Sequence, residues 1–176
     1  MKKIKVGIAL PKVAQRYDYD CGAAALKSIY EYEYPDDVND ISKYIKLLGS
    51  SEENGTNTKS LELACKVLGL TALSISDMSL NRLLKELDRK NPVLCLIRSN
   101  DHGHFVIAIG YDKDLIFFED PFKKKYNGYL SKNEFYRRWT DGDNHSELKR
   151  FGLVIKSDYS GHNKTKTIKA NKITGD

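Results

Sequence analysis

The stretch QRYDYDCGAAALKSIY, residues 15–30, decides how this chain is interpreted. A polar run ends at Asp20, and Cys21 is followed by glycine and three alanines. Residues 21–34 are strong helix formers and Pro35 stops them, so we expect a helix that begins at the cysteine, with Asp20 as its N-cap. A helix N-terminus favours negative charge, and a cysteine attacks as its thiolate. The stretch therefore raises the question of whether Cys21 is a packed thiol or a reactive one.

The two other cysteines illustrate the packed alternative. Cys65 lies on the apolar face of a helix expected at 58–70, and Cys95 lies inside an apolar run at 92–99. Free cysteine is among the most buried residue types, so we predict that both belong to the core. Three sparse cysteines make no disulfide framework, which favours a reducing compartment and predicts a cytoplasmic protein.

Composition excludes several other classes. The 176 residues suit one domain with a hydrophobic core, and 40% apolar with 30% charged residues is ordinary for a globular protein. No apolar run reaches the length of a membrane span, and the first apolar patch is broken at Gly7 and ended by Pro11, so no signal peptide is expected. The net charge is +5. Five lysines against two aspartates in residues 156–176 supply +3 of it, so no nucleic-acid partner is expected.

Helical patterns fill the first half of the chain, and strand patterns fill the second. Helices are expected at 21–34, 38–49, 58–70, 79–90 and 131–139, and strands at 3–10, 71–76, 92–99, 104–111, 115–120, 125–130 and 151–157. This order predicts an α+β protein with segregated layers. We expect residues 1–157 to form a single two-lobed domain and residues 158–176 to form a flexible, lysine-rich tail.

The strands expected at 104–111 and 115–120 carry a histidine and an aspartate, and the loop between the strands decides whether these two residues are neighbours. A three-residue loop between them would pair Tyr111 with Leu115. In that register His104 and Asp120 are diagonal neighbours on one face of the sheet. A four-residue loop moves the register by one residue, sets His104 near Pro121 and turns Asp120 to the opposite face. The sequence alone leaves both registers open.

A histidine and a carboxylate in contact have a clear chemical use. The carboxylate fixes the tautomer of the imidazole, whose other nitrogen can take a proton from a thiol. The alternative is a strand-end histidine satisfied locally, with Asp120 simply starting a turn. His102 shares the parity of His104 and is the reserve candidate for the base. The two histidines together are weak evidence for a metal site, because no third ligand lies close in sequence. Gln15, in the loop before Cys21, could join the Cys21 N–H in stabilising an oxyanion.

The order glutamine, cysteine, histidine, aspartate resembles that of the papain-like cysteine peptidases. It is most similar to the C39 family, which processes bacteriocin leader peptides. The resemblance rests on Gln15 six places before Cys21, on DCGAAAL at 20–26, on GHFVIAIGYD at 103–112 and on EDP at 119–121. It covers about residues 13–155, nearly the whole folded part.

The resemblance implies both a fold and a set of roles. It implies the papain-like fold, a helical lobe followed by an antiparallel sheet lobe, with the site between them. It further implies that Cys21 is the nucleophile, His104 the general base and acid, Asp120 its orienting partner and Gln15 an oxyanion donor. No cofactor and no metal are implied, and the partner would be a peptide or protein substrate.

The chain also departs from the family pattern. C39 domains commonly precede the membrane and ATP-binding parts of an exporter, and these 176 residues contain neither. The polar stretch at 140–150 and the lysine-rich tail are further differences. The substrate therefore does not transfer from the family. Besides peptide cleavage, two alternatives stay open: a non-catalytic peptide-binding module on the same fold, and acyl transfer to an amine through the same thioester. All four chemical positions are filled, which argues against a degenerate site.

Overall fold

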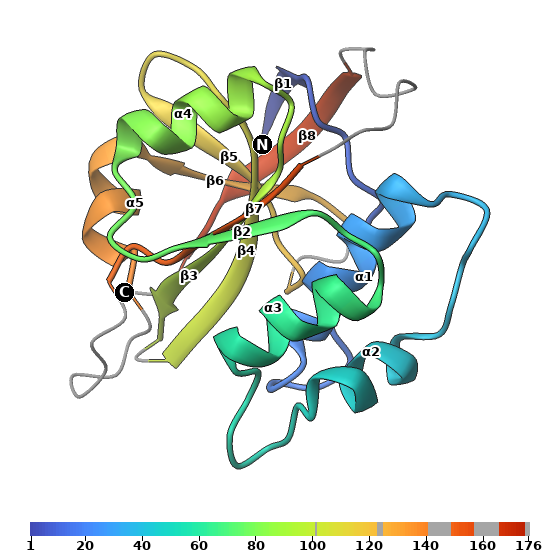
Figure 1. Cartoon of the computed structure of the whole chain (residues 1–176). Coiled ribbons are helices and arrows are strands. Elements are labelled where there is room, and N and C mark those ends of the chain that lie inside the picture. Colours follow the sequence, from blue (N-terminus) through green and yellow to red (C-terminus); the bar gives the residue numbers. More distant parts are fainter. Residues whose placement is uncertain (101, 123–124, 141–148, 157–165, 175–176) are drawn as a thin grey trace.

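A computed structural model describes residues 1–100, 102–122, 125–140, 149–156 and 166–174 of the chain (Figure 1). Its helices are α1 (Cys21–Glu33), α2 (Ile41–Leu48), α3 (Thr58–Val67), α4 (Leu80–Asp88) and α5 (Lys132–Arg138). Its strands are β1 (Lys2–Val6), β2 (Ala72–Ile75), β3 (Val93–Ser99), β4 (His102–Tyr111), β5 (Leu115–Glu119), β6 (Asn127–Ser131), β7 (Gly152–Ile155) and β8 (Lys166–Lys172). None of the described helices is both long and apolar enough to cross a membrane.

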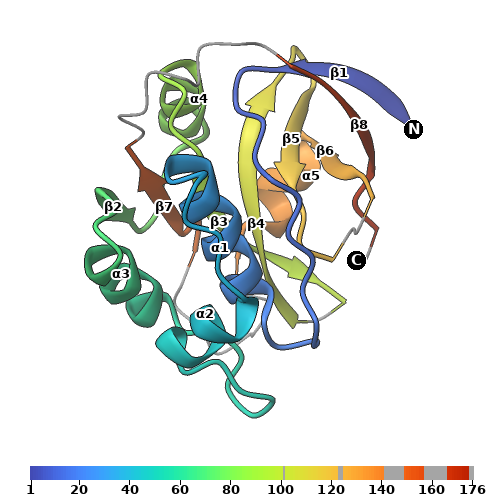
Figure 2. The ribbon, with the colours of Figure 1, turned by 90° about the vertical axis from the view of Figure 1, so that its right-hand side faces the viewer.

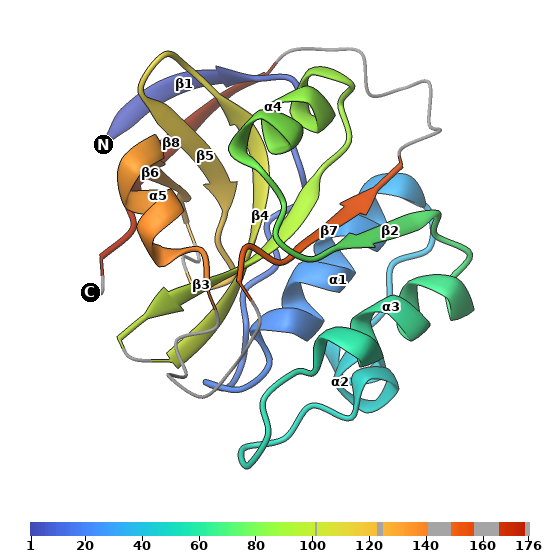
Figure 3. The same cartoon turned by 60° about the vertical axis from the view of Figure 1, so that its left-hand side comes forward.

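The described strands form one sheet in the order β1-β8-β6-β5-β4-β3-β7-β2. All neighbouring pairs are antiparallel except β6 and β8, which run parallel. Helices α1, α2 and α3 gather on one side of the sheet, with α1 beside β4, and α5 lies on the side away from them (Figure 2). At the other end of the sheet, β7 and β2 extend it past β3 toward α3 (Figure 3). The predicted helical lobe followed by a sheet lobe is therefore confirmed.

Small residues let α1 lie close to its neighbours. Ala23, Ala24 and Ala25 are fully buried, and the helix packs against β4. A Cβ atom at Gly22 would lie only 2.6 Å from Thr56, so the loop between α2 and α3 also rests directly on the backbone of α1. The alanine run of the opening stretch therefore serves close packing around the first turn of the helix.

The β4–β5 hairpin differs from the prediction at its turn and agrees with it at its far end. Asp112 N–H donates to the carbonyl of Leu115, so the loop is shorter than either predicted one, and Tyr111 pairs with Ile116 instead of Leu115. A β-bulge between Ala108 and Gly110 then shifts the register by one residue.

Beyond the bulge the register is the one that the three-residue loop would have produced. Ile107 pairs with Glu119, and continuing this register sets Val106 opposite Asp120. His104 and Asp120 consequently share one face of the sheet. Neither of the two loops considered is found, and of the two registers left open the one that brings His104 and Asp120 together occurs, because the extra residue in β4 compensates for the shorter loop.

The prediction of a flexible tail was wrong for residues 166–174. Lys166–Lys172 form β8, which pairs with β1 and with β6 and so joins an edge of the sheet. Within the strand itself, the apolar side chains that face the core are partly buried Ile168 and fully buried Ala170. The other five residues of the strand are lysine or polar, so the sequence shows no apolar pattern there. The remainder of the expected tail, residues 158–165 and 175–176, lies outside the described residues, as does most of the polar stretch at 141–148.

Candidate active site

Cys21 is the first residue of α1 and is 6% exposed. Because α1 packs against β4, its first turn lies beside the start of that strand, where His104 is found. The thiol is close enough to the imidazole to raise the pKa of His104. The fold thus brings together two residues that are 83 positions apart in the sequence (104 − 21).

His104 and Asp120 are in direct contact, because the strand register beyond the bulge places them on the same face of the sheet. The Nε2 atom of His104 lies 2.8 Å from Oδ1 of Asp120. The same carboxylate oxygen accepts the backbone N–H of Phe122 at 3.0 Å, which holds the aspartate in its rotamer. Since the carboxylate occupies Nε2, the other ring nitrogen, Nδ1, is the one available for proton exchange with the thiol.

These contacts shift both members of the pair toward their charged forms. Burial disfavours the imidazolium, but the hydrogen bond to Asp120 and the interaction with Cys21 outweigh it and raise the pKa of His104 to about 10. Burial likewise disfavours the carboxylate of Asp120, which is 1% exposed, yet the contact with His104 lowers its pKa overall. The imidazole is therefore held as a cation at neutral pH, with the carboxylate behind it.

A second ion pair, between an exposed lysine and a buried glutamate, lies next to this one, and the sequence analysis missed it. Glu119 is fully buried, and Lys12 Nζ contacts its Oε1 at 2.8 Å and the carbonyl oxygen of Asp120 at 3.3 Å. Burial nevertheless dominates and raises the pKa of Glu119 to about 7. No pattern in the sequence around Lys12 points to this contact, because the two residues are 107 positions apart.

Gln15, the predicted oxyanion donor, lies beside the Asp120 segment. Its backbone N–H donates to the carbonyl of Pro121 at 3.0 Å. Its side-chain Nε2 donates to the carbonyl of Tyr17 at 2.9 Å, and its Oε1 atom is buried without a hydrogen-bond partner. An amide nitrogen carries two hydrogens, so the contact with Tyr17 orients the group and leaves one N–H for another acceptor.

Asp20 does not cap α1, contrary to the prediction. Its fully buried carboxylate turns back and accepts the backbone N–H of Arg16, at 3.1 and 3.2 Å, and that of Tyr17, at 3.1 Å. The backbone of Asp20 is at φ −105° and ψ 19°, away from the extended conformation that an N-cap adopts. The first turn of α1 consequently has no side-chain acceptor, and the loop that carries Gln15 is folded around a buried carboxylate.

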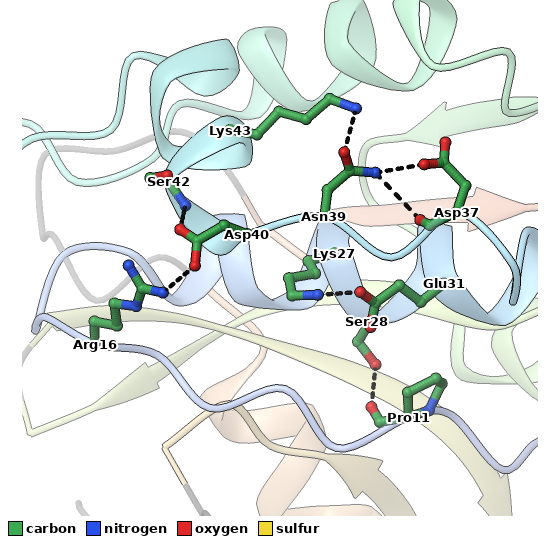
Figure 4. A network of polar contacts seen from close by, with 10 residues as sticks. All are labelled: Pro11, Arg16, Lys27, Ser28, Glu31, Asp37, Asn39, Asp40, Ser42 and Lys43. Atoms are coloured by element: carbon green, nitrogen blue, oxygen red, sulfur yellow. Dashed lines mark hydrogen bonds and ion pairs between the residues drawn. The ribbon is translucent and has the colours of Figure 1, made fainter.

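The outer side of this loop is fastened to the helical lobe (Figure 4). Arg16 Nη2 donates to Asp40 at 2.5 Å, and Ser28 Oγ on α1 donates to the carbonyl of Pro11 at 2.7 Å. Asp40 in turn accepts the backbone N–H of Ser42. The loop is therefore tied at several points between α1 and α2, which restricts the movement of Gln15 relative to Cys21.

Two hollows meet at the cysteine and histidine. The larger, of about 620 Å³, contains Cys21 and is walled by residues 52–58 and Phe105. The smaller, of about 180 Å³, contains His104 and Asp120. The residues that line both are Asp18, His102 and Gly103. The pair thus lies where an extended chain could pass from one hollow to the other.

The remaining sequence candidates fall outside the contact. His102, the reserve base, begins β4 and is exposed at the boundary of the two hollows, whereas His104 makes the contacts with Asp120 and Cys21. In the part of the chain that the structure describes, no group of three or more histidine, cysteine or acidic side chains could hold a metal ion. Cys65 and Cys95 are fully buried, as predicted. Burial raises the pKa of the Cys65 thiol to about 12 and also raises that of Cys95.

Comparison with known proteins agrees with this arrangement. The family model of the peptidase C39 family matches residues 9–142, which is most of the chain. A curated protein of Pseudomonas fluorescens, the probable functional amyloid protease FapD, is 26% identical over 132 residues. That match covers 72% of this chain and 56% of the relative, so the chain spans little more than half the length of that protein.

Solved structures show the same fold. A putative C39-like peptidase from Bacillus anthracis superposes with a TM-score of 0.68 at 16% identity, over 89% of this chain and 98% of that one. The peptidase domain of Streptococcus ComA gives 0.64 at 21% identity, over 85% and 98%. A double glycine motif protease from an AMS/PCAT transporter, solved with a leader peptide, gives 0.61 at 23% identity, over 85% and 92%. The chain has the papain-like fold of these domains and belongs to the peptidase C39 family of cysteine peptidases.

Proposed function

We propose that this cysteine peptidase cleaves its substrate through Cys21, His104 and Asp120, with Gln15 as an oxyanion donor. The observation that carries the proposal is the arrangement around one imidazole. Asp120 contacts its Nε2 atom at 2.8 Å, and the Cys21 thiol interacts with the same ring. A thiol and a base in contact, with a third group orienting the base, is the arrangement that nucleophilic catalysis requires.

The first half of the reaction uses the charges already described. The His104 imidazolium stabilises the thiolate of Cys21, and the sulfur attacks the carbonyl carbon of the scissile bond. The carbonyl oxygen becomes an oxyanion, which accepts hydrogen bonds from the Cys21 backbone N–H and the Gln15 amide. His104 then gives its proton to the leaving nitrogen. The carbon–nitrogen bond breaks, the amine product leaves, and a thioester to Cys21 remains.

The second half regenerates the enzyme. Neutral His104 takes a proton from a water molecule, whose oxygen attacks the thioester carbonyl. The carbon–sulfur bond breaks, and the acid product leaves. Asp120 stabilises the imidazolium in both halves and keeps Nε2 occupied, so that Nδ1 always faces the reacting atoms. An amine in place of the water would give acyl transfer, which would be recognised by a product that depends on the added amine.

For the substrate, we propose the leader segment of a secreted peptide, cut after a pair of glycines. Two similar structures support this class, because one is named a double glycine motif protease and was solved with a leader peptide, and another is part of a transporter. The groove beside Cys21 is lined partly by Gly55 and Thr56, and a Cβ atom at Gly22 would collide with Thr56. The walls are therefore close to the thiol, which suits residues without side chains at the scissile bond.

The test uses synthetic peptides that contain a double glycine and matched peptides in which alanines replace both glycines. Mass spectrometry should find cleavage after the second glycine only in the first set. The Cys21→Ala variant should lose cleavage, and Cys65→Ala should retain it, because Cys65 is a core thiol away from both hollows. Peptide binding by the unaltered chain without turnover of any peptide would contradict the proposal and indicate a binding module.

A further inference from the structure

The smaller hollow has a wall that comes from the other end of the chain. Ile173 and Thr174, which follow β8, line it together with His104 and Asp120. The family model ends at residue 142, so this wall lies outside the residues that the model matches. Figure 2 shows β8 beside β1, which is the edge strand of the sheet, and away from the helical lobe that carries Cys21.

Burial and a backbone hydrogen bond hold this wall in the folded core. Ile173 is 2% exposed, and its backbone N–H donates to the carbonyl of Tyr129 on β6 at 3.0 Å. It lies against Gly128, where an added Cβ atom would come within 2.6 Å of Ile173 Cγ1 and 3.6 Å of Asp120 Cβ. The absence of a side chain at Gly128 therefore lets Ile173 approach the catalytic aspartate. Thr174, the next residue, is exposed at the edge of the hollow.

The chemistry of the reaction decides which part of a substrate would occupy each hollow. The acyl part becomes bonded to Cys21, which lines only the larger groove. The leaving nitrogen takes its proton from His104, which lines only the smaller hollow. The residue that carries this nitrogen, the first one after the scissile bond, must consequently lie on the imidazole side.

We propose that the smaller hollow is the subsite for the first residue of the leaving peptide, and that Ile173 and Thr174 determine which side chains it accepts. This inference rests on the proposed function. The volume of about 180 Å³ corresponds to roughly six water molecules at about 30 Å³ each, which suits a side chain of small or medium size. Its lining mixes polar Ser99, Asn100 and Thr174 with the ring of Phe122, which is 61% exposed.

The test fills the hollow and compares two leaving groups. In Thr174→Trp, the indole should occupy the space without disturbing the core, because Thr174 is exposed. One substrate carries leucine after the scissile bond, and the other has the same acyl part as a methyl ester, which places no side chain there. We expect kcat/KM for the leucine peptide to fall about tenfold or more, with the ester within about twofold of its original value.

Thr167→Trp is the matched control, since Thr167 is exposed on β8, pairs with Lys5 and does not line the hollow. It should leave both substrates unchanged. An unchanged ratio of peptide to ester cleavage in Thr174→Trp, with an active unaltered chain, would overturn this inference alone. Failure of the unaltered chain to cleave either substrate would overturn the proposed function and the subsite with it.

Discussion

Helices α1 and α2 each follow an aspartate, but only the aspartate before α2 caps its helix with its side chain. Asp40, at φ −68° and ψ 145°, caps α2 by accepting the N–H of Ser42 at 2.9 Å. Asp20 instead turns back to the loop before α1 and leaves the first turn of that helix without a side-chain acceptor. The three other described helices behave like α2, with Asn57, Ser79 and Ser131 as their caps.

This difference explains how the start of α1, which we call the reactive start, can favour negative charge. A cap satisfies one of the free N–H groups of a helix, and at α1 these groups stay available beside Cys21. They favour negative charge on the sulfur and on an oxyanion next to it. Arg16 links the two helix starts, because its backbone N–H binds Asp20 and its side chain binds Asp40. The Arg16 contact and the Ser42 N–H hold the pKa of Asp40 well below its usual range.

The largest effect should come from removing the imidazole at the reactive start. His104→Ala should lower kcat/KM by about 10⁴-fold or more, because the base, the acid and the counter-ion of the thiolate are lost together. Asp40→Ala should keep kcat/KM within about twofold, since α2 begins away from both hollows. Steady-state cleavage of a fluorogenic peptide measures both. Equal losses in the two variants would remove the contrast between the helix starts.

A smaller loss should follow from removing the Gln15 amide. Gln15→Ala should lower kcat by about 10²- to 10³-fold, with little change in KM, because an oxyanion donor acts mainly in the transition state. Gln15→Glu should not restore the rate, since a carboxylate would repel the oxyanion. Pre-steady-state acylation rates with an ester substrate report the effect directly. A loss confined to KM would indicate that Gln15 binds substrate instead.

The two aspartates should differ in their contributions to stability. Asp20→Ala leaves the partly buried backbone N–H groups of Arg16 and Tyr17 without this acceptor, which should lower the free energy of unfolding by about 2 kcal/mol. Asp40→Ala removes one exposed cap and should cost about 1 kcal/mol. Urea unfolding followed by circular dichroism measures both. A larger cost at Asp40 than at Asp20 would reverse the comparison.

The smallest effect is a pH dependence that only the reactive start should show. The folded pKa of His104 is about 10 against an ordinary value of 6.5, so its stabilising contribution is complete below 6.5 and is lost as the pH rises through 10. The difference in unfolding free energy between the unaltered chain and His104→Gln should shrink across that window. The corresponding difference for Asp40→Ala should stay constant there, because the pKa of Asp40 lies far below it. Urea titrations at several pH values would show either outcome.

The sequence predicted the helix and strands that carry this site better than the contacts that support them. Apolar periodicity located the helix at Cys21 and the strands that carry His104 and Asp120, because core-facing side chains repeat with the period of each element. The bulge in β4 left no such trace, since the residue it adds is as apolar as its neighbours. The sequence therefore offered the contact between His104 and Asp120 as one of two registers and could not choose between them.

Three other features could not be foreseen, and each depends on distant partners. Asp20 had the residue type and place of an N-cap, and only the path of the loop before it makes it bind Arg16 instead. Lys12 contacts Glu119 because the N-terminal segment packs against the end of β5. The strand β8 is formed by pairing with β1 and β6, and its own sequence is mostly polar.

The central claim is that the Cys21 thiol and the His104 imidazole act as a pair at the start of α1. The rate at which iodoacetamide alkylates Cys21 in the folded protein at about pH 6, read by peptide mass spectrometry, tests it most directly. We predict a rate well above that of Cys65 and Cys95 in the unfolded chain, falling to their rate in His104→Ala. Alkylation of Cys21 no faster than that of the unfolded thiols, or unaffected by His104→Ala, would contradict the account.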